Sequence, residues 1–432
     1  MTRTHLARRL SGAAIVGIVA VTLAGAFSGS ASADSLPAAD CVTACTATFD
    51  TAGATDTLLI PTGITSLTAT IAGAAGAPAS FAITNDPTAV GGPGGATLVD
   101  LGTAYAGDTL TFGIGNTGHG SYLQDGSTLL AVAGGGGGGG YAGLLDDPGQ
   151  IFATYPGGNG GAPSAPGVAP GANGAAFGSL AANGGGGTAA AGTAGTGDFN
   201  ATAGGATTTV TAVDSTLAAG GTGGTFTDGT TSITHNGGAG GSGYTGGGGG
   251  AIARNVPNGD DNVDVVAPGG GGAGYLDASL TAQDEPFNTG TGSVSFTWSF
   301  TPTITTTTTT AHRGDTVPVT ITGLPANEPF TVVFDGTTVI TGTSDGSGDA
   351  TESFVVGSGQ VAGSFALSLV AGGSTAATSD PVTVIVVLAA TGSTNPILPG
   401  ALGGLVILAG AAAVILASRR EKKWALPGST PR

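Results

Sequence analysis

The chain has 432 residues, 85 of them glycine, and only 9% of its residues are charged. Acidic residues outnumber basic ones by 27 to 10, and between Asp34 and Thr391 the only basic residues are Arg254 and Arg313. Because phosphate recognition needs lysine or arginine, this composition argues against nucleic acid as a partner. The same span contains no lysine, which excludes a Walker A loop and lysine-based covalent catalysis.

Residues 1–33 predict a secretory signal peptide that is removed from the mature protein. Three arginines precede the apolar segment 13–27, and a small-x-small cleavage site follows it. The cleavage-site residues are Ala31, Ser32 and Ala33, with Asp34 as the expected first residue of the mature protein. The alternative interpretation is an uncleaved N-terminal anchor.

The two cysteines of the chain, Cys41 and Cys45, follow the predicted cleavage site closely. In an exported chain two neighbouring cysteines are more often paired than free, so we expect a disulfide bond. A metal site would need about four ligands, and no histidine or further cysteine lies nearby. A lipid-anchor cysteine is disfavoured because Asp40 stands where that motif has a small residue.

The next part of the chain alternates β-favouring segments with glycine-rich turns, which predicts a mainly β fold. The predicted strands are 57–60, 64–71, 96–101, 109–114, 128–133 and 292–298. Pro61, Thr62 and Gly63 form a turn between the first two segments. We therefore expect these two segments to pair with each other.

Several short motifs in this region occur in an order that resembles a known domain. They are Phe49-Asp50-Thr51, Pro61-Thr62-Gly63, Gly73-Ala74-Ala75-Gly76, Ala106-Gly107-Asp108, Ala131-Val132-Ala133-Gly134 and the closing strand 292–298. The succession resembles the glycine-rich domain of many bacterial surface proteins and of the anaplastic lymphoma kinase ectodomain. The resemblance covers about 49–300. It implies an antiparallel β-sandwich that carries polyglycine-II-type glycine-rich insertions.

Four glycine-rich runs are the candidates for these insertions: 134–140, 184–187, 237–250 and 269–274. Extended chains of this kind leave backbone N–H and C=O groups pointing outward, and such groups need partners when they are buried. Chains without Cβ atoms can approach closely enough to bond one another. The alternatives are a flexible linker and a dinucleotide site, and the second lacks the strand-turn-helix context that it would need.

We find no catalytic or metal-binding set in the sequence, and we predict neither a cofactor nor enzymatic activity. His119, His235 and His312 are scattered, and none has a partner at metal-ligand spacing. The acidic segment 258–264 has carboxylates suited to calcium, but it lacks the spacing and the closing glutamate of an EF-hand. A solvated acidic loop is therefore the preferred interpretation of this segment.

Residues 301–387 predict a second β-sandwich, because short β-favouring segments alternate with turns at the spacing of that architecture. The motifs Gly314-Asp315-Thr316, Gly323-Leu324-Pro325 and Asp345-Gly346-Ser347-Gly348 resemble bacterial immunoglobulin-like repeats. Arg313-Gly314-Asp315 also spells an integrin-binding tripeptide. In such repeats these residues form the turn that enters a strand, which is the interpretation we prefer.

The C-terminal region 388–432 combines three features in a fixed order. The pentapeptide Leu388-Ala389-Ala390-Thr391-Gly392 precedes an apolar run, 397–416, and a basic cluster begins at Arg419. About 20 apolar residues in a helix span about 30 Å, the thickness of the hydrocarbon core. The basic cluster places the C-terminus in the cytoplasm, so we expect a transmembrane helix with everything before Leu388 outside the membrane.

This order resembles the cell-wall sorting signal of Gram-positive surface proteins, in the LAxTG variant of the LPxTG motif. The resemblance implies that a membrane-bound sortase of the LAxTG-reading class cuts between Thr391 and Gly392. The sortase would then join Thr391 to an amine of a peptidoglycan precursor. The tail 424–432 is longer than is usual in this family. The alternative is a single-span type I membrane protein that is not cleaved by sortase.

The sequence thus predicts a signal peptide (1–33), a glycine-rich β domain (34–300), an immunoglobulin-like domain (301–387) and a sorting signal (388–432). The predicted function is a structural or adhesive module anchored to the cell wall, with a ligand on a host or environmental surface. A surface-layer protein without a ligand and a secreted enzyme with an unrecognised site are the alternatives.

Overall fold

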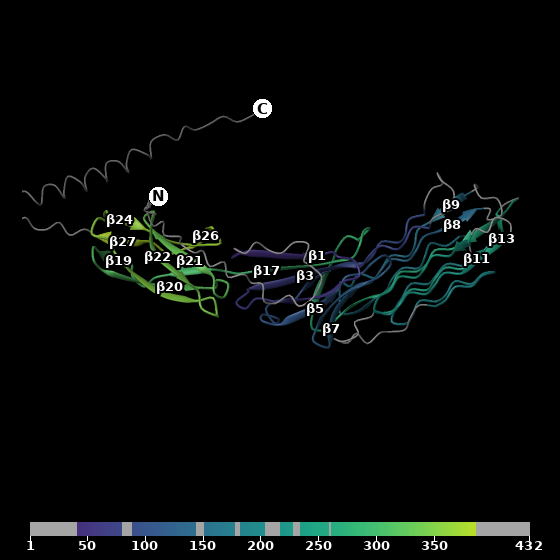
Figure 1. Ribbon diagram of the computed structural model, residues 1–432, viewed down its shortest axis with the longest axis horizontal. Helices are drawn as coiled ribbons and strands as arrows, with labels where there is room; N and C mark the ends of the chain where they lie inside the picture. The colour runs from purple at the N-terminus through teal and green to yellow at the C-terminus, as the bar shows by residue number, and fades with distance from the viewer. Residues whose placement is uncertain are drawn as a thin grey trace, which may run out of the picture. The chain divides into compact units, whose positions relative to one another are not determined.

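The computed structural model describes residues 41–79, 89–143, 151–177, 182–203, 217–227, 234–258 and 261–385. Within these ranges the regular secondary structure is β-strand, in mostly antiparallel sheets, which confirms the predicted mainly β fold (Figure 1). None of these residues belongs to a helix long and apolar enough to cross a membrane. The predicted transmembrane segment 397–416 lies outside the described residues.

Two antiparallel sheets form the first part of the fold. The five-stranded sheet contains, in spatial order, β1 (Ala44–Phe49), β17 (Ser293–Ser299), β3 (Ser66–Ala72), β4 (Ala96–Asp100) and β16 (Thr281–Asp284). The six-stranded sheet contains β10 (Gly167–Ala169), β15 (Gly274–Leu276), β7 (Thr128–Ala133), β6 (Ser121–Asp125), β5 (Thr109–Gly113) and β2 (Thr55–Leu59). Because β1 pairs with β17, the two ends of this region lie side by side.

One hydrophobic core is built from the inward faces of these two sheets. The residues of β3 alternate along the strand, so that Leu67, Ala69 and Ile71 are buried while the residues between them are not. Phe49, Phe112 and Phe296 come from three strands of both sheets and meet with ring centroids 4.6 to 6.3 Å apart. Along β3 the alternation of buried and less buried residues thus shows which face of the strand lies in the core.

The predicted pairing of 57–60 with 64–71 is wrong. β2 pairs with β5, whereas β3 pairs with β17 and β4 in the other sheet. The turn at 61–63, where Gly63 has a φ of 78°, carries the chain from one sheet to the other. Ile60 and Ile64 on either side of this turn are both buried in the shared core. With the two segments in different sheets, each buries its apolar residues in the same core.

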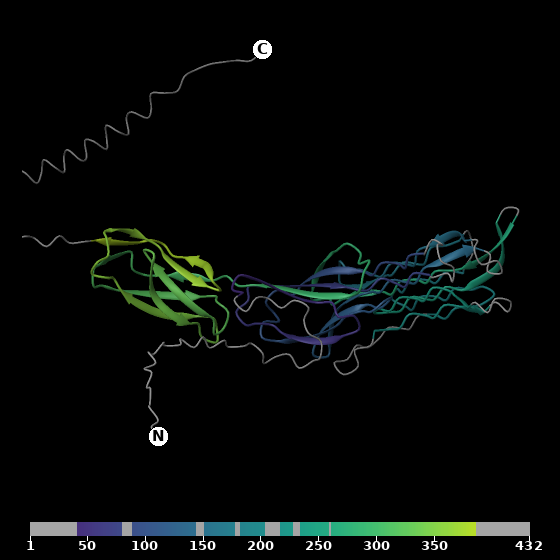
Figure 2. The ribbon, with the colours of Figure 1, turned by 45° about the horizontal axis from the view of Figure 1, so that its top comes forward.

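The glycine-rich segments run side by side from these sheets to a second group of strands (Figures 1 and 2). A four-stranded sheet there contains β13 (Ile252–Asn258), β14 (Asp261–Val266), β8 (Gly140–Gly143) and β9 (Ile151–Tyr155). β11 (Thr225–Thr227) and β12 (Thr234–Asn236) form a separate pair. Three of the four glycine runs, 134–140, 237–250 and 269–274, thus connect strands at both of their ends, whereas 184–187 adjoins no strand among the described residues.

The hydrogen-bond partners of the glycine runs change in a cycle of three residues. In the run 134–139, Gly134 and Gly137 donate to Gly161 and Gly158, Gly135 and Gly138 donate to Ser242 and Ala239, and Gly136 and Gly139 donate to Ala74 and Ala77. The N···O distances of these six bonds are 2.7 to 3.0 Å. Three residues per turn is the period of a polyproline II-type helix, whose backbone groups point outward in three directions.

A second run, 269–273, follows the same cycle. Gly269 and Gly272 donate to Gly138 and Gly135, whereas Gly270 and Ala273 donate to Gly248 and Thr245. Each run therefore bonds several neighbours at once, unlike a β-strand, which bonds at most two. The buried N–H groups of these runs have backbone partners, and this pattern favours an ordered bundle over a flexible linker.

We expect the amides of these two runs to exchange slowly with solvent. Their N–H groups are bonded and most of the glycines are buried, so exchange requires the bundle to open. Hydrogen–deuterium exchange of the full chain, followed by mass spectrometry, should show peptides from 134–140 and 269–274 exchanging at least about a thousandfold more slowly than an unstructured chain. Exchange in both peptides at the unstructured rate would support linkers instead.

Residues 301–385 contain three further sheets around a separate core. The first contains β18 (Thr303–Thr305), β20 (Thr316–Thr322) and β23 (Ala350–Val355), and the second contains β19 (Thr310–His312), β27 (Val382–Ile385) and β24 (Gly363–Phe365). The third contains β22 (Thr337–Thr343), β21 (Pro329–Phe334), β25 (Leu367–Ala371) and β26 (Ser374–Thr378). In β20 the alternation is complete, because Val317, Val319 and Ile321 are buried and the residues between them are exposed.

Candidate functional site

The predicted processing sites lie largely outside the described residues. This applies to the signal-cleavage residues Ala31, Ala33 and Asp34 and to the sorting motif Leu388, Ala389, Ala390, Thr391 and Gly392. Cys41 and Cys45 are described, and they form a disulfide bond at the start of β1 with a Cα–Cα distance of 5.8 Å. The bond closes a small loop, which in the chain-entropy account of disulfides stabilises the fold by about 2 kcal/mol.

The three histidines of the described regions lie in separate places. His119 Nδ1 is 3.0 Å from the carbonyl oxygen of Thr117 in an exposed loop, and His235 is buried with Nδ1 2.8 Å from the hydroxyl of Tyr141. His312 pairs with Asp315 across a turn. Within the described ranges no three metal-ligating side chains gather at one place. Each histidine thus has a local structural contact.

The described residues of the acidic segment 258–264 belong to the β13–β14 hairpin, with Asn258 opposite Asp261, so the interpretation as a solvated loop is wrong for residues 261–264 of β14. The carboxylate of Asp264 is 5% exposed and accepts a hydrogen bond of 2.9 Å from the backbone N–H of Asn255. It also lies 3.5 Å from Nε of Arg254. The Asp264 carboxylate therefore makes contacts within the hairpin. Residues 259 and 260 lie outside the described ranges.

The tripeptide Arg313-Gly314-Asp315 forms a closed turn between β19 and β20. Gly314 has a φ of 90°, and the Asp315 carboxylate accepts a hydrogen bond from the backbone N–H of His312. This bond lowers the pKa of Asp315. The Arg313 side chain donates to the carbonyl oxygen of Gln360, 2.7 Å away. Asp315 is thus bonded within the turn and Arg313 is bonded to Gln360, and the turn leads into β20 as expected for a strand entry.

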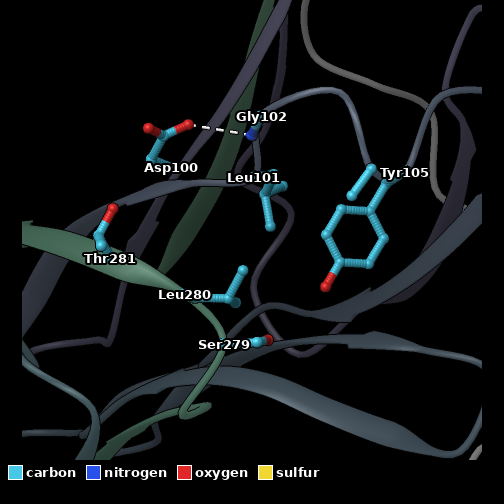
Figure 3. A pocket seen from close by; sticks show the side chains of 8 residues that line it. Asp100, Leu101, Gly102, Tyr105, Ser279, Leu280 and Thr281 are labelled. Carbon is cyan, nitrogen blue, oxygen red and sulfur yellow. Dashed lines mark hydrogen bonds between the residues drawn. The ribbon is translucent and has the colours of Figure 1, made fainter.

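A depression of about 310 Å³ lies where the loop after β4 meets the start of β16 (Figure 3). We call it the Tyr105 depression; it is lined by Asp100, Leu101, Gly102, Ala104, Tyr105, Ser279, Leu280 and Thr281. Leu101 and Leu280 are buried and form its apolar part. Figure 3 shows the Tyr105 ring on one side of these leucines, with Asp100 and Thr281 on the other side.

Two short turns fix the rim of the Tyr105 depression. The Asp100 carboxylate accepts a hydrogen bond of 2.9 Å from the N–H of Gly102, whose φ is 59°. The Asp277 carboxylate accepts bonds of 2.9 and 2.6 Å from the N–H and hydroxyl of Ser279. These bonds from Ser279 lower the pKa of Asp277, so the carboxylate is ionised at neutral pH.

The surroundings of Tyr105 are acidic. Partial burial raises the pKa of the Tyr105 phenol, and the negative charges of Asp125, Asp277 and Asp108 raise it further. Asp100, which lines the depression, is a fourth carboxylate of this region. The site therefore combines an aromatic ring, an apolar floor and a negative electrostatic potential.

The outward face of the five-stranded sheet leads into this depression. In register across the five strands stand Thr46, Thr297, Thr68, Asp100 and Thr281, which we call the polar rank. The hydroxyls of Thr46 and Thr297 are 3.2 Å apart, and in the next row those of Thr48 and Ser295 are 3.0 Å apart. No sequence motif predicted this site. The alternating serines and threonines of 66–70 and 293–299 were a visible signal of an outward face.

No protein-family model and no curated protein matches the chain. Among solved structures, a polysaccharide lyase aligns with 84% of this chain at 9% sequence identity and a TM-score of 0.16. The alignment covers 47% of that lyase, so this chain spans about half of its length. A TM-score this low does not establish a shared fold.

Proposed function

We propose that this chain is an exported surface protein that a sortase joins covalently to the cell wall, where it acts as a structural or adhesive module. The observation that carries this proposal is the order of three features in the sequence. Leu388-Ala389-Ala390-Thr391-Gly392 is followed by the apolar run 397–416 and by the basic cluster from Arg419. A helix stopped in the bilayer with its positive end in the cytoplasm holds the pentapeptide at the outer membrane surface.

The reaction implied by the motif exchanges one acyl bond for another. The sortase thiolate attacks the carbonyl carbon of Thr391, the peptide bond to Gly392 breaks, and the new amino group of Gly392 takes up a proton. A wall-precursor amine then attacks the resulting thioester and gives up a proton, which releases the thiolate and leaves Thr391 in an amide bond. The released fragment is the membrane segment with its tail, and the residues before Gly392 stay with the wall.

The proposed architecture suits a surface location. We infer an antiparallel β-sandwich with a polyglycine-II-type bundle, then an immunoglobulin-like β-sandwich and one C-terminal transmembrane helix. Support for the first part comes from the shared core of the two sheets and the three-residue cycle of hydrogen bonds. The Cys41–Cys45 disulfide is weakly consistent with export, because disulfides persist in oxidising compartments.

A second candidate is a single-span type I membrane protein that keeps its anchor. The tail 424–432, which extends beyond the basic cluster, favours this candidate, because sorting signals resembling this one usually end sooner. Both candidates place residues 34–387 outside the cell. They differ in the covalent state of Thr391, and this difference can be measured.

Fractionation of the expressing cells tests the proposal. We expect the protein to stay with the wall after boiling in detergent and to be released by a peptidoglycan hydrolase. Mass spectrometry of the released protein should then find a C-terminal peptide that ends at Thr391 and carries a wall fragment. Complete extraction by detergent with the peptide 425–432 still present would support the membrane protein instead.

A further inference from the structure

The Tyr105 depression has the mixture of groups that holds a sugar ring. The ring carbons of a sugar present C–H groups on one face, which pack against an aromatic or apolar surface, and its hydroxyls bond to polar side chains at the edge. Leu101, Leu280 and Tyr105 supply the apolar and aromatic surface, while Asp100 and Thr281 supply polar groups (Figure 3). A small number of polar groups around a mainly apolar surface is typical of small-molecule binding sites.

The negative charge near the depression favours cationic sugars as ligands. Asp100 lines it, and the carboxylates of Asp108, Asp125 and Asp277 act electrostatically on Tyr105. Between residues 34 and 300 the sequence has a single basic side chain, Arg254, which lies against Asp264 and over the ring of Phe226. No lysine or arginine of this region therefore offsets the carboxylates at Tyr105. A cationic ligand is complementary to this potential, and an ammonium group beside an aromatic ring gains further attraction.

The polar rank indicates a polymer rather than a single sugar. Neighbouring strands lie about 4.8 Å apart, so the five positions from Thr46 to Thr281 extend over about 19 Å. Thr46, Thr297 and Thr281 are exposed, and each offers a hydroxyl that both donates and accepts. A chain whose first unit lies in the depression can therefore meet a row of hydroxyls along the sheet.

We propose that the Tyr105 depression and the polar rank together bind a polysaccharide that carries free amino groups, with one glucosamine-type unit in the depression. The proposal rests on the adhesive role proposed above, since it names the class of ligand. In the proposed complex the protonated amine pairs with the carboxylate of Asp100, which lines the depression, and the C–H face of the ring packs against Tyr105 and the leucines. The following units lie over the threonines of the rank.

Binding of defined oligosaccharides to the full chain, purified in detergent, tests the proposal. Isothermal titration with a glucosamine hexamer should give saturable binding that weakens as salt is raised, because the attraction is partly between charges. The fully N-acetylated hexamer has the same backbone without the positive charges and should bind at least about tenfold more weakly, equivalent to about 1.4 kcal/mol. Absence of binding by the glucosamine hexamer, or equal binding of the two hexamers, would overturn the proposal.

Amino-acid substitutions test whether the glycan binds in the Tyr105 depression. Tyr105→Ala and Asp100→Asn should each weaken binding of the glucosamine hexamer at least about tenfold, and Tyr105→Phe should retain most of it because the ring is kept. Glu352→Gln removes one exposed negative charge from β23 and should leave binding unchanged. Equal loss in Glu352→Gln and Asp100→Asn would show nonspecific attraction to an acidic protein and refute the site. Circular dichroism of each variant checks that its fold is kept.

Cell fractionation of the Tyr105→Ala variant distinguishes a failure of this proposal from a failure of the anchoring proposal. Tyr105→Ala should remain linked to the wall to the same extent as the unchanged chain, because Tyr105 lies far from the sorting motif in the sequence. Loss of glycan binding with intact wall linkage supports both proposals. Intact glycan binding in that variant contradicts the site and leaves anchoring unaffected.

Discussion

Replacing Gly271 by alanine is expected to destabilise the glycine-rich domain by about 3 kcal/mol or more, although it adds a single methyl group. Gly271 is buried, and a Cβ built on it would overlap the backbone carbonyl of Asn159. Its own N–H donates to Ala172 over 2.9 Å, and its carbonyl oxygen accepts from Gly187 over 2.9 Å. The methyl group can be accommodated only if one of these backbone segments moves and loses its bonds.

Gly290→Ala is the matched control for this prediction. A Cβ at Gly290 would meet only the side chain of Asn288, at an ordinary contact distance of 3.6 Å, and its φ is not in the left-handed region. Both replacements reduce the freedom of the unfolded chain equally. The control is therefore expected to change the free energy of unfolding by no more than about 0.5 kcal/mol.

Urea unfolding of the full chain in detergent, followed by tryptophan fluorescence, measures both variants. Trp298 is 5% exposed and packs in the core of the two sheets, so it reports on this domain. Hydrogen exchange of peptides from 157–161 and 269–274 should also become faster in Gly271→Ala and not in Gly290→Ala. Equal stability of the two variants would show that the glycine segments are not closely packed.

Replacing Thr391 by alanine is expected to abolish linkage of the protein to the cell wall. In the proposed reaction the carbonyl carbon of Thr391 is the atom that sortase attacks, and the Thr side chain is part of the motif that sortase reads. The apolar run and the basic cluster are unchanged by this variant, so export and retention in the membrane should continue. The protein should accumulate, uncut, in the detergent-soluble membrane fraction.

Thr394→Ala is the matched control, because it makes the same chemical change two residues beyond the motif. Immunoblots of the wall and membrane fractions should show wall-linked Thr394→Ala at the level of the unchanged chain. Wall-linked Thr391→Ala at that same level would refute sortase anchoring at this motif and favour the uncleaved membrane protein. Loss in both variants would point to a defect in export rather than in sorting.

Several strands could be read from the sequence with small errors at their ends. The predicted segment 128–133 coincides with β7, and 96–101 and 109–114 each extend one residue beyond β4 and β5. Segment 109–114 alternates apolar and polar residues, whereas 96–101 and 128–133 are short, mostly apolar runs bounded by turns, and both patterns are typical of strands with a buried face. Strand β13 was missed because Arg254, Asn255 and Pro257 interrupt the pattern of β-favouring residues, and β14 was missed because its first residues, 261–264, were interpreted as part of an acidic loop.

Local sequence patterns did not determine which strands pair with one another. The turn at 61–63 is compatible with a hairpin and with a change of sheet, and only the shared core decides between them. The Tyr105 depression likewise combines 100–105 with 279–281, which are distant in sequence and adjacent only because β4 pairs with β16. No local pattern in either segment indicates the other.

The sequence by itself determined where the glycine runs lie, how long they are, and that their backbone groups would need partners. Which run bonds to which was decided only by the tertiary structure. Glycine has no side chain, so a run such as 134–139 carries no pattern that distinguishes one neighbour from another. The strands at the ends of the runs do carry such patterns, and their packing fixes the position and register of the chains between them.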